Sequence, residues 1–498
     1  MTNQTTSPTG TNVAATPPLP NHAPVATTTA STAQEHNAPA VATGAAHTPK
    51  KDKKEATLGR VATASMIGTT IEFYDFFIYG TAAALVFPTI FFPNMTPLMS
   101  TIASFATFGV AFLARPLGSI VFGHFGDQLG RKRTLVWTLL LMGFATLFIG
   151  LLPGYQSGAW GLFENGIGIW GPILLVAMRF AQGLAVGGEW AGATLLTAEY
   201  APPGKRGLYA IFPQIGPAIA FFLSSGTFLL ISVLLGETSD AFINWGWRIP
   251  FVLSVVMVAI GMYVRVVIDE TPSFAKELER REKGEVAEKK TFPFMDTLRY
   301  QWKEAVLGGV ALASLFTLFY MGTSFLTSYA TGTLGHSRQA VLAIGMGAAI
   351  VFGISTALSA LYSDRIGRNK VILISTIGAV IWSPFLFYIL DMGTLWSFTA
   401  GLYGTLMIFG IAYGPAGAML PELFRVDLRY TGAGLAYNIA AILGGAIPPL
   451  LAAAIAETYG GFGVGLMLAG FGITSSIAVS LIRSNHSDEI DADGPATA

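Results

Sequence analysis

The segment Gly123–Arg133, with the sequence GHFGDQLGRKR, returns in shorter form at Ser363–Lys370 as SDRIGRNK. Asp127 of the first segment matches Asp364 of the second, and a Gly-Arg pair follows each aspartate at the same distance. Each segment follows a long apolar stretch of the chain. Two similar basic segments in equivalent surroundings indicate an internal duplication, so we expect two halves with the same helical topology.

A second repeated pair supports the duplication. Glu199 precedes Arg206 by seven positions. Glu422 precedes Arg429 by the same number. The two copies lie 223 positions apart, 14 fewer than the copies of the first motif, because the loop at 154–170 has no long counterpart in the second half. Two independent pairs at equivalent positions argue against chance similarity between short basic loops.

The composition is that of a chain embedded mostly in lipid. Of 498 residues, 52% are hydrophobic and only 12% are charged, whereas soluble domains carry about 25% charged residues. The chain has no Cys, which excludes disulfide bonds, thiolate metal sites and cysteine nucleophiles. Its 29 basic residues balance 29 acidic residues, so general nucleic-acid binding is not expected.

Long runs without a charged residue, such as 76–114, 207–236 and 430–456, exceed the ~20 apolar residues that span a bilayer as a helix. They are too long for core strands and too apolar for surface helices. The alternating segments of about ten residues that a transmembrane β-barrel requires are not seen. We therefore expect an all-α membrane protein with twelve transmembrane helices. The expected spans are 62–92, 98–122, 134–153, 171–199, 207–235, 247–268, 304–330, 339–361, 371–391, 395–421, 430–456 and 461–482.

The basic residues predict the orientation of these spans. If the chain begins in the cytoplasm, 24 of the 29 Lys and Arg residues lie on the cytoplasmic side, so both termini are expected to be cytoplasmic. The expected parts are a disordered cytoplasmic N-terminal tail (1–57), an N-terminal six-helix bundle (58–269), a cytoplasmic central loop (270–302), a C-terminal six-helix bundle (303–482) and a cytoplasmic C-terminal tail (483–498).

Ionisable residues within the expected spans are the strongest functional signal. Each costs roughly 2.5–3.5 kcal/mol at a helix centre and therefore needs a partner or an aqueous cavity. The ones that stand out are Glu72, Asp75, Arg115, Arg179 and Glu189, all in the first half; the last six spans contain no comparable charge at mid-helix. We expect proton coupling to use Asp75, Arg179, Glu72 and Glu189.

Helical spacing groups several of these side chains. Glu72 and Asp75 share one face of the first span, and Tyr79 continues it. Gln182 and Glu189 stack on one stripe of the fourth span, with Arg179 next to it. We expect further substrate contacts from aromatic and amide side chains. These candidates are Tyr74, Tyr79, Gln182, Trp190, Gln214, Tyr320, Tyr329, Tyr437 and Asn438. For Gln214 and Asn438, an interhelical hydrogen bond is an equal alternative.

The repeated basic loop and the Glu/Arg pairs resemble the signature motifs of the major facilitator superfamily. Further motifs resemble its metabolite:H⁺ symporters, which include shikimate, α-ketoglutarate, citrate and proline/betaine permeases. These motifs are Glu72–Phe76, Ala114–Gly118, Val186–Trp190 and Trp245–Pro250. The resemblance covers about 60–482; Ala360 and Asn369 depart from the pattern, in place of a Gly and a basic residue.

The resemblance implies two pseudo-symmetric six-helix halves that work by alternating access. Asp75 and Arg179 match an Asp–Arg couple of the related sugar/H⁺ symporters. Protonation of Asp75 would release Arg179 to hold a substrate carboxylate. The alternative is a static ion pair between spans 1 and 4. Glu72 and Glu189 are either further proton sites or salt-bridge partners of Arg115 and Arg179.

Charged residues at the inner surface are expected to form a cytoplasmic gate that fastens the two halves together. The alternative is that these basic loops only control topology. The expected gate residues are Asp127, Arg131, Glu199, Arg206, Asp364, Arg365, Arg368, Glu422 and Arg429.

The expected function is proton-coupled uptake of a small polar metabolite, an organic acid, across the cytoplasmic membrane. The alternatives are symport of a zwitterion such as proline or betaine, export by proton antiport, and a membrane ligand sensor. We expect no enzymatic activity, no cofactor and no metal; the phosphate-binding motif of ATP-driven proteins is absent from the sequence. The expected partners are the substrate, protons and the lipid bilayer, with a functional monomer.

Overall fold

The computed structural model describes residues 50–129, 131–159, 163–187, 206–236, 239–267, 293–425 and 428–483. Within these ranges it describes side chains except at 50–61, 123–133, 135, 163–164, 206–207, 265–267 and 293. The predicted tails and most of the predicted central loop lie outside the described residues. The helices belong to a compact unit that begins at Lys51.

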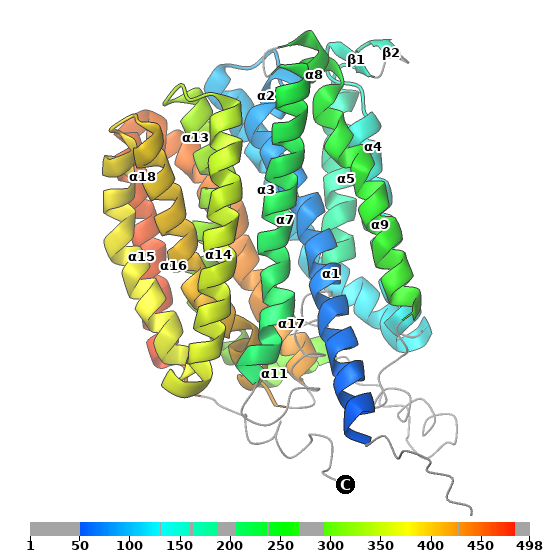
Figure 1. The fold of residues 1–498 in the computed structure, drawn as a ribbon, viewed down its shortest axis with the longest axis vertical. Helices are drawn as coiled ribbons and strands as arrows, with labels where there is room; N and C mark the ends of the chain where they lie inside the picture. The colour runs from blue at the N-terminus through cyan, green and yellow to red at the C-terminus, as the bar shows by residue number, and fades with distance from the viewer. Residues whose placement is uncertain are drawn as a thin grey trace, which may run out of the picture. The chain divides into compact units, whose positions relative to one another are not determined.

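The first half of the chain is helical apart from one short hairpin (Figure 1). α1 begins at Lys50, inside the segment predicted as a tail, because the run KKDKKEA contains no Gly or Pro and consists largely of good helix formers. The elements of the first half are α1 (Lys50–Leu85), α2 (Phe87–Ile90), α3 (Pro97–Leu129), α4 (Arg131–Leu151), β1 (Ser157–Ala159), β2 (Phe163–Asn165), α5 (Trp170–Val186), α7 (Arg206–Leu235), α8 (Asp240–Asn244), the 3₁₀ helix η1 (Gly246–Arg248) and α9 (Ile249–Val267).

The second half is helical wherever it is described with regular structure. Its elements are α11 (Pro293–Tyr300), α12 (Trp302–Tyr320), the π-helix η2 (Met321–Phe325), α13 (Leu326–Gly332), α14 (Arg338–Ile366), α15 (Arg368–Leu390), α16 (Leu395–Glu422), α17 (Arg429–Ala441), the π-helix η3 (Ile442–Ala446) and α18 (Ile447–Leu481). α11 lies within the predicted central loop and begins with a proline, which suits the first turn of a helix. Along the interface between the halves, α7 packs against α14 (Figure 1).

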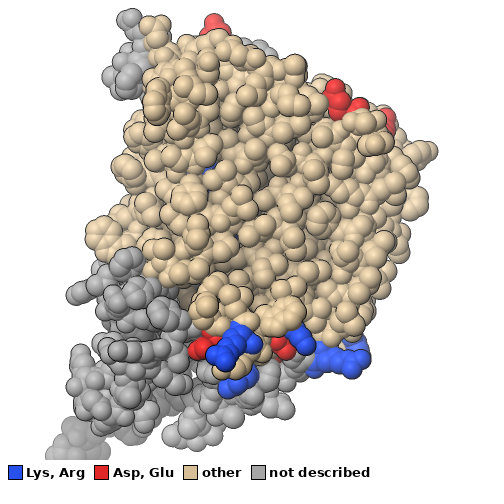
Figure 2. Space-filling view, turned by 180° about the vertical axis from the view of Figure 1, so that it is seen from behind, with Lys and Arg blue, Asp and Glu red and all other residues tan. Residues whose placement is uncertain are grey.

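Many of these helices have the length and apolar composition of membrane spans. Among the described residues, eight helices are long and apolar enough to cross one, and two shorter apolar helices cover Val136–Leu151 and Trp170–Val186. Large apolar side chains such as Phe144 and Ile354 are exposed on the outside of the bundle. Figure 2 shows that charged side chains on the described face gather almost entirely at its two ends. This distribution leaves a broad apolar band for the lipid chains.

Two helices contain a π-helical turn that a span count from sequence does not show, and a third break coincides with a predicted span boundary. η2 and η3 each insert one π-helical turn into an otherwise continuous helix, a feature found often at functional sites. Within α18, Gly460 has φ 69° and ψ −176°, so the helix direction breaks between the predicted eleventh and twelfth spans. Gly tolerates this positive φ without a Cβ clash.

Arg248 organises the end of the first half where β1 and β2 lie. The two strands pair antiparallel, with Ser157 opposite Asn165. The fully buried Arg248 guanidinium donates to the carbonyl oxygens of Gly158, at 3.2 Å, and Leu152. A five-donor guanidinium can tie such a loop to the end of α4, where helix carbonyls lack intrahelical partners.

Close packing of α3 and α5 brings their polar side chains together. A Cβ atom at Gly118 would overlap the backbone carbonyl of Leu184, and one at Gly183 would overlap that of Ala111. Small residues of this kind let two membrane helices approach backbone to backbone. The approach places Arg115 of α3 and Arg179 of α5 in one buried cluster, which is described next.

Candidate functional site

A chain of three hydrogen bonds joins Asp75 to Arg179. The Thr146 hydroxyl of α4 donates to Asp75 Oδ2 at 2.8 Å. Gln182 of α5 donates through Nε2 to the Thr146 oxygen at 2.6 Å, and its Oε1 accepts from Arg179 Nη1 at 2.9 Å. All four side chains are at least 98% buried. The predicted Asp–Arg couple is therefore connected through two neutral side chains, and no direct ion pair between them exists in the described structure.

Among the four side chains joined by these hydrogen bonds, only Thr146 carries a hydroxyl group. Its single hydrogen has two possible acceptors. Besides Asp75 Oδ2, the Met142 carbonyl oxygen lies 2.9 Å from Thr146 Oγ1. A hydroxyl donates one hydrogen and can accept others. The direction of the Asp75–Thr146 hydrogen bond can therefore reverse with the protonation state of Asp75, with no heavy atom moving.

Aromatic rings surround the Arg179 guanidinium. Its Cζ atom lies 4.0 Å from the ring centre of Tyr79, 4.1 Å from that of Phe76 and 5.0 Å from that of Phe108. Tyr79 is fixed in place because its hydroxyl donates to Thr107 Oγ1 at 2.7 Å. Stacked rings stabilise a buried cation but accept no conventional hydrogen bonds in its plane. Within the described part of the chain, Arg179 Nε and Nη2 have no hydrogen-bond partner.

Arg115 lies in the same cluster. Its Cζ atom is 4.8 Å from the ring centre of Phe76 and 5.1 Å from that of Phe112. The ring of Tyr320, from the second half, packs against Phe112 with ring centres 4.9 Å apart. Phe76 thus contacts both guanidinium groups, and rings from both halves of the chain enclose the site.

The other predicted first-half residues lie around this cluster or outside the described residues. Glu72 is 97% buried. Tyr74 is buried beside Thr227 of α7. The predicted proton site Glu189 and the predicted substrate contact Trp190 lie outside the described residues.

Two aromatic candidates come from the second half. Tyr437 packs edge-on against Phe316, with ring centres 4.9 Å apart. Tyr329 lies away from the cluster, where its hydroxyl donates to Asp391 Oδ1 at 3.0 Å. Among the described residues, no group of three or more His, Asp or Glu side chains could hold a metal ion.

Gln214 and Asn438 make hydrogen bonds between the two halves. Gln214 of α7 donates to the Tyr413 carbonyl oxygen of α16 at 2.6 Å. Asn438 of α17 donates to the Gly187 carbonyl oxygen at 3.2 Å. The donors lie 224 positions apart and the acceptors 226, close to the 223 of the repeated Glu/Arg pair. Both amides thus make interhelical hydrogen bonds, and the two hydrogen bonds form a pseudo-symmetric pair.

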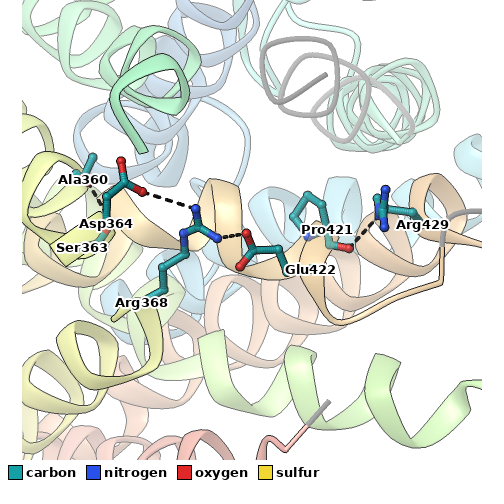
Figure 3. A network of polar contacts seen from close by, with 7 residues as sticks. All are labelled: Ala360, Ser363, Asp364, Arg368, Pro421, Glu422 and Arg429. Atoms are coloured by element: carbon teal, nitrogen blue, oxygen red, sulfur yellow. Dashed lines mark hydrogen bonds and ion pairs between the residues drawn. The ribbon is translucent and has the colours of Figure 1, made fainter. Parts of the chain in front are cut away.

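Part of the predicted gate forms a polar network at one end of the second half (Figure 3). Arg368 lies 3.3 Å from Asp364 Oδ1 and also pairs with Glu422, so it links α14, α15 and α16. Arg429 donates through Nε to the Pro421 carbonyl oxygen at 3.1 Å. These contacts join helices of one half to each other. Arg365 is exposed, and the side chains of Asp127, Arg131, Glu199 and Arg206 lie outside the described residues.

Sequence reasoning missed Thr146, Thr107 and Phe76, which connect and support the two predicted charges. A threonine in an apolar span carries no special signal, because its hydroxyl commonly bonds to a carbonyl one turn earlier. Thr146 also makes that bond, to Met142. The only available signal was spacing: on α1, Phe76 lies three residues before Tyr79 and thus on the same side of the helix.

Most of the chain is similar to known transport proteins. The profile of the family described as "Sugar (and other) transporter" matches residues 61–482. The chain is 45% identical over 432 residues to the inner membrane metabolite transport protein YhjE of Escherichia coli K12, covering 86% of this chain and 94% of that protein. It is 38% identical to the shikimate transporter (81% and 89% covered) and 32% identical to the proline/betaine transporter (80% and 78%), both of the same organism.

The fold has solved counterparts at low sequence identity. A partially occluded, inward-open structure of the xylose transporter XylE from E. coli superimposes with a TM-score of 0.67 at 16% identity. The match covers 86% of this chain and 98% of that one. At this identity the likeness concerns the fold alone, and it confirms the predicted all-helical fold class.

Proposed function

The chain belongs to the sugar (and other) transporter family of the major facilitator superfamily, and from this premise we propose that it carries a small organic acid into the cell together with protons. It is a multi-pass membrane transporter and not an enzyme. The observation that carries the proposal is the buried chain from Asp75 through Thr146 and Gln182 to Arg179. It connects a group that can bind a proton to a group that can bind a carboxylate.

The proposed topology has twelve spans, with both termini in the cytoplasm. The described helices support it in two ways. The continuous apolar segment Arg429–Leu481 is long enough for two spans and breaks at Gly460. The basic side chains of Arg365, Arg368 and Lys370 lie at the end of the bundle where α14 ends and α15 begins, as the positive-inside rule requires for a cytoplasmic loop.

Thr146 can transmit a change in the protonation state of Asp75 to Arg179. When Asp75 is ionised, the Thr146 hydroxyl donates to it and the negative charge polarises Gln182 and Arg179 through the chain. When Asp75 takes up a proton, its own O–H donates to Thr146, whose hydrogen turns to the Met142 carbonyl. The series of hydrogen bonds from Arg179 then ends at a neutral Asp75, so the attraction of Arg179 for a substrate carboxylate rises.

Arg179 is suited to hold that carboxylate. Its Nη1 atom is used by Gln182, while no hydrogen bond within the described structure engages Nε and Nη2. These two nitrogens lie on one edge of the guanidinium plane, the arrangement that binds a carboxylate with two parallel hydrogen bonds. The stacked rings of Phe76 and Tyr79 hold the plane in position.

The aromatic rings argue for an anion over a zwitterion. The cation of proline or betaine would seek an aromatic face. In this site, Phe76, Tyr79 and Phe108 already stack on Arg179, and Phe112 stacks on Arg115. A second cation there would also meet the repulsion of both guanidinium groups. Among the named relatives, the shikimate transporter therefore provides a better chemical guide than the proline/betaine transporter.

Uptake into proteoliposomes tests the proposed function. The purified full-length chain is reconstituted with the interior one pH unit more alkaline than the exterior and the membrane potential clamped at zero. We expect accumulation of at least one organic acid above its outside concentration, and loss of that accumulation when a protonophore collapses the gradient. Accumulation of proline or betaine but of no acid would favour the zwitterion alternative. Binding without any transport would favour the sensor.

The hydrogen bonds of Gln214 and Asn438 between the two halves are expected to stabilise the state that is closed to the cytoplasm. Gln214→Met and Asn438→Leu each remove one hydrogen bond between the halves. A hydrogen bond contributes about 0.5–1.5 kcal/mol net, so each substitution is expected to shift the equilibrium roughly two- to tenfold toward the state open to the cytoplasm. Spin-label distances between cysteines introduced at Leu208 and Tyr362 measure this shift, since the chain has no Cys of its own.

Gln339 provides the matched control for this experiment. Its amide donates to the Ser232 carbonyl oxygen at 3.1 Å and also crosses between the halves, but Ser232 is in the last turn of α7 whereas Gln214 is near its start. Gln339→Met is therefore expected to shift the same distance distribution in the opposite direction. Equal shifts from all three substitutions would show that they merely loosen the packing.

A further inference from the structure

Phe76 of α1 contacts both buried guanidinium groups with its ring. Arg179 Cζ lies 4.1 Å and Arg115 Cζ 4.8 Å from its ring centre, and the side chain is only 4% exposed. We propose that Phe76 is a positioning residue. The electrostatics of its ring allow the two cations to lie in one cluster and set the affinity of Arg179 for the substrate carboxylate. This inference rests on the organic-acid symport proposed above.

Two like charges in one buried cluster need a group that attracts both. Because both distances are measured from the same ring centre, the two guanidinium carbons are no farther apart than their sum. Water and salt screen the repulsion between buried charges poorly. The face of an aromatic ring carries the negative part of its quadrupole and attracts a cation above it. Phe76 therefore attracts both cations, whereas an aliphatic side chain of similar size would attract neither.

A ring stabilises a cation without using the hydrogen-bond donors of that cation. A protein carboxylate beside Arg179 would occupy its N–H groups and neutralise its charge. The Phe76 ring does neither, and Arg179 Nε and Nη2 have no hydrogen-bond partner within the described structure. The ring thus fixes the guanidinium plane and leaves one edge available for a substrate carboxylate. Arg115 depends less on Phe76, because it is also hydrogen-bonded to the hydroxyl group of Tyr320.

The neighbouring phenylalanine rings make weaker contacts of the same kind. Phe108 lies 5.0 Å from Arg179 Cζ, and Phe112 lies 5.1 Å from Arg115 Cζ. Each of these two rings contacts one guanidinium group in the described part of the chain, and at a longer distance than Phe76 does. Since the attraction of a ring for a cation falls with distance, a change in ring charge is expected to have its largest effect at Phe76.

Stepwise fluorination of the ring tests the inference, because each fluorine withdraws charge from the ring face and changes the size of the ring little. Phe76 is replaced by mono-, di- and trifluorophenylalanine in the full-length chain. The Kd values of butyrate, succinate and shikimate are measured by titration calorimetry at one fixed pH. For each acid that binds, we expect Kd to rise with every added fluorine, by about three- to tenfold over the series. The same series at Phe112 is expected to raise Kd less than about twofold, because its ring contacts Arg115 and not Arg179.

Phe105 of α3 is the matched control. It is 1% exposed and packs against Phe325, with ring centres 6.3 Å apart, and no guanidinium contact of its ring is seen among the described residues. Fluorination at Phe105 is expected to leave Kd unchanged. An equal rise at Phe105 and Phe76 would show that fluorine only loosens the packing, and this would overturn the inference.

The remaining outcomes separate the inference from the proposed function. A constant Kd along the Phe76 series, with binding and uptake intact, would overturn the role of Phe76 and leave organic-acid symport standing. A falling Kd would show that the ring competes with the substrate for the cation and would also overturn it. If none of the three acids binds, the thermal unfolding midpoint without ligand decides, since it is expected to fall stepwise at Phe76 and not at Phe105. Equal midpoints would then overturn the inference. Absence of binding and uptake of any organic acid would refute the proposed function itself.

Discussion

Replacing Asp75 with asparagine is expected to abolish uphill uptake and to leave exchange of substrate across the membrane intact. Asparagine resembles the protonated aspartate, because its amide can donate to Thr146 Oγ1 as the protonated acid would. The variant therefore binds substrate but cannot release a proton. With a gradient of one pH unit and the membrane potential clamped at zero, one coupled proton supports about tenfold accumulation. We expect this ratio to fall to unity in the variant.

Asp240→Asn is the matched control for this prediction. It makes the same chemical change on an exposed side chain at the start of α8, remote from the site in sequence, and accumulation is expected to be unaffected. Counterflow of labelled substrate measures exchange in both variants. Tenfold accumulation by Asp75→Asn would rule out Asp75 as the coupling group. Loss of exchange together with accumulation would indicate that Asp75 serves mainly to hold α1, α4 and α5 together.

Replacing Arg179 with lysine is expected to weaken substrate binding strongly, even though the positive charge is kept. Lysine cannot present two parallel donors to a carboxylate, and it loses the planar stacking on Phe76 and Tyr79. Lysine keeps at most one of the two hydrogen bonds, and a hydrogen bond to a charged group contributes about 1.5–3 kcal/mol. This corresponds to an increase in Kd of roughly tenfold to 150-fold, measured by calorimetry with the acid that the uptake assay identifies.

Arg299→Lys makes the same change on an exposed side chain of α11 and is expected to leave Kd unchanged. Size-exclusion profiles of both variants separate weak binding from misfolding. An unchanged Kd in Arg179→Lys would show that the carboxylate binds elsewhere. The static alternative would then remain, in which Arg179 and Asp75 only stabilise the packing of α5 against α1 and α4.

The apolar helices could be predicted from the sequence because insertion into lipid depends on the residues of one segment at a time. The charge-free runs at 207–236 and 430–456 correspond to α7 and to the segment from α17 into α18. The buried charges could be found in the same way, since Asp75, Arg115 and Arg179 interrupt apolar segments. The structure shows all three as buried. It also brings Asp364, Arg368 and Glu422 together, although their role as a gate stays a prediction.

The connections between these residues could not be predicted. A direct Asp75–Arg179 pair was the simplest expectation from the sequence, yet the structure inserts Thr146 and Gln182 between them. Thr146 lies 71 residues from Asp75 and 36 from Gln182 along the chain. Nothing in its neighbourhood in the sequence distinguishes it from other threonines in apolar spans. The same limit applied to Gln214 and Asn438, for which a ligand contact and an interhelical bond had equal support.

The sequence by itself determined that this protein is a duplicated bundle of membrane helices with a few charges buried in its first half. The free energy of burying a helix in lipid is a sum over the residues of that helix and can be read locally. Only the tertiary structure decided which of those charges share a hydrogen bond, and through which neutral side chains. Hydrogen bonds require a separation near 3 Å and the right direction, and both depend on how far each helix is rotated and how closely glycines such as Gly118 let it approach its neighbour.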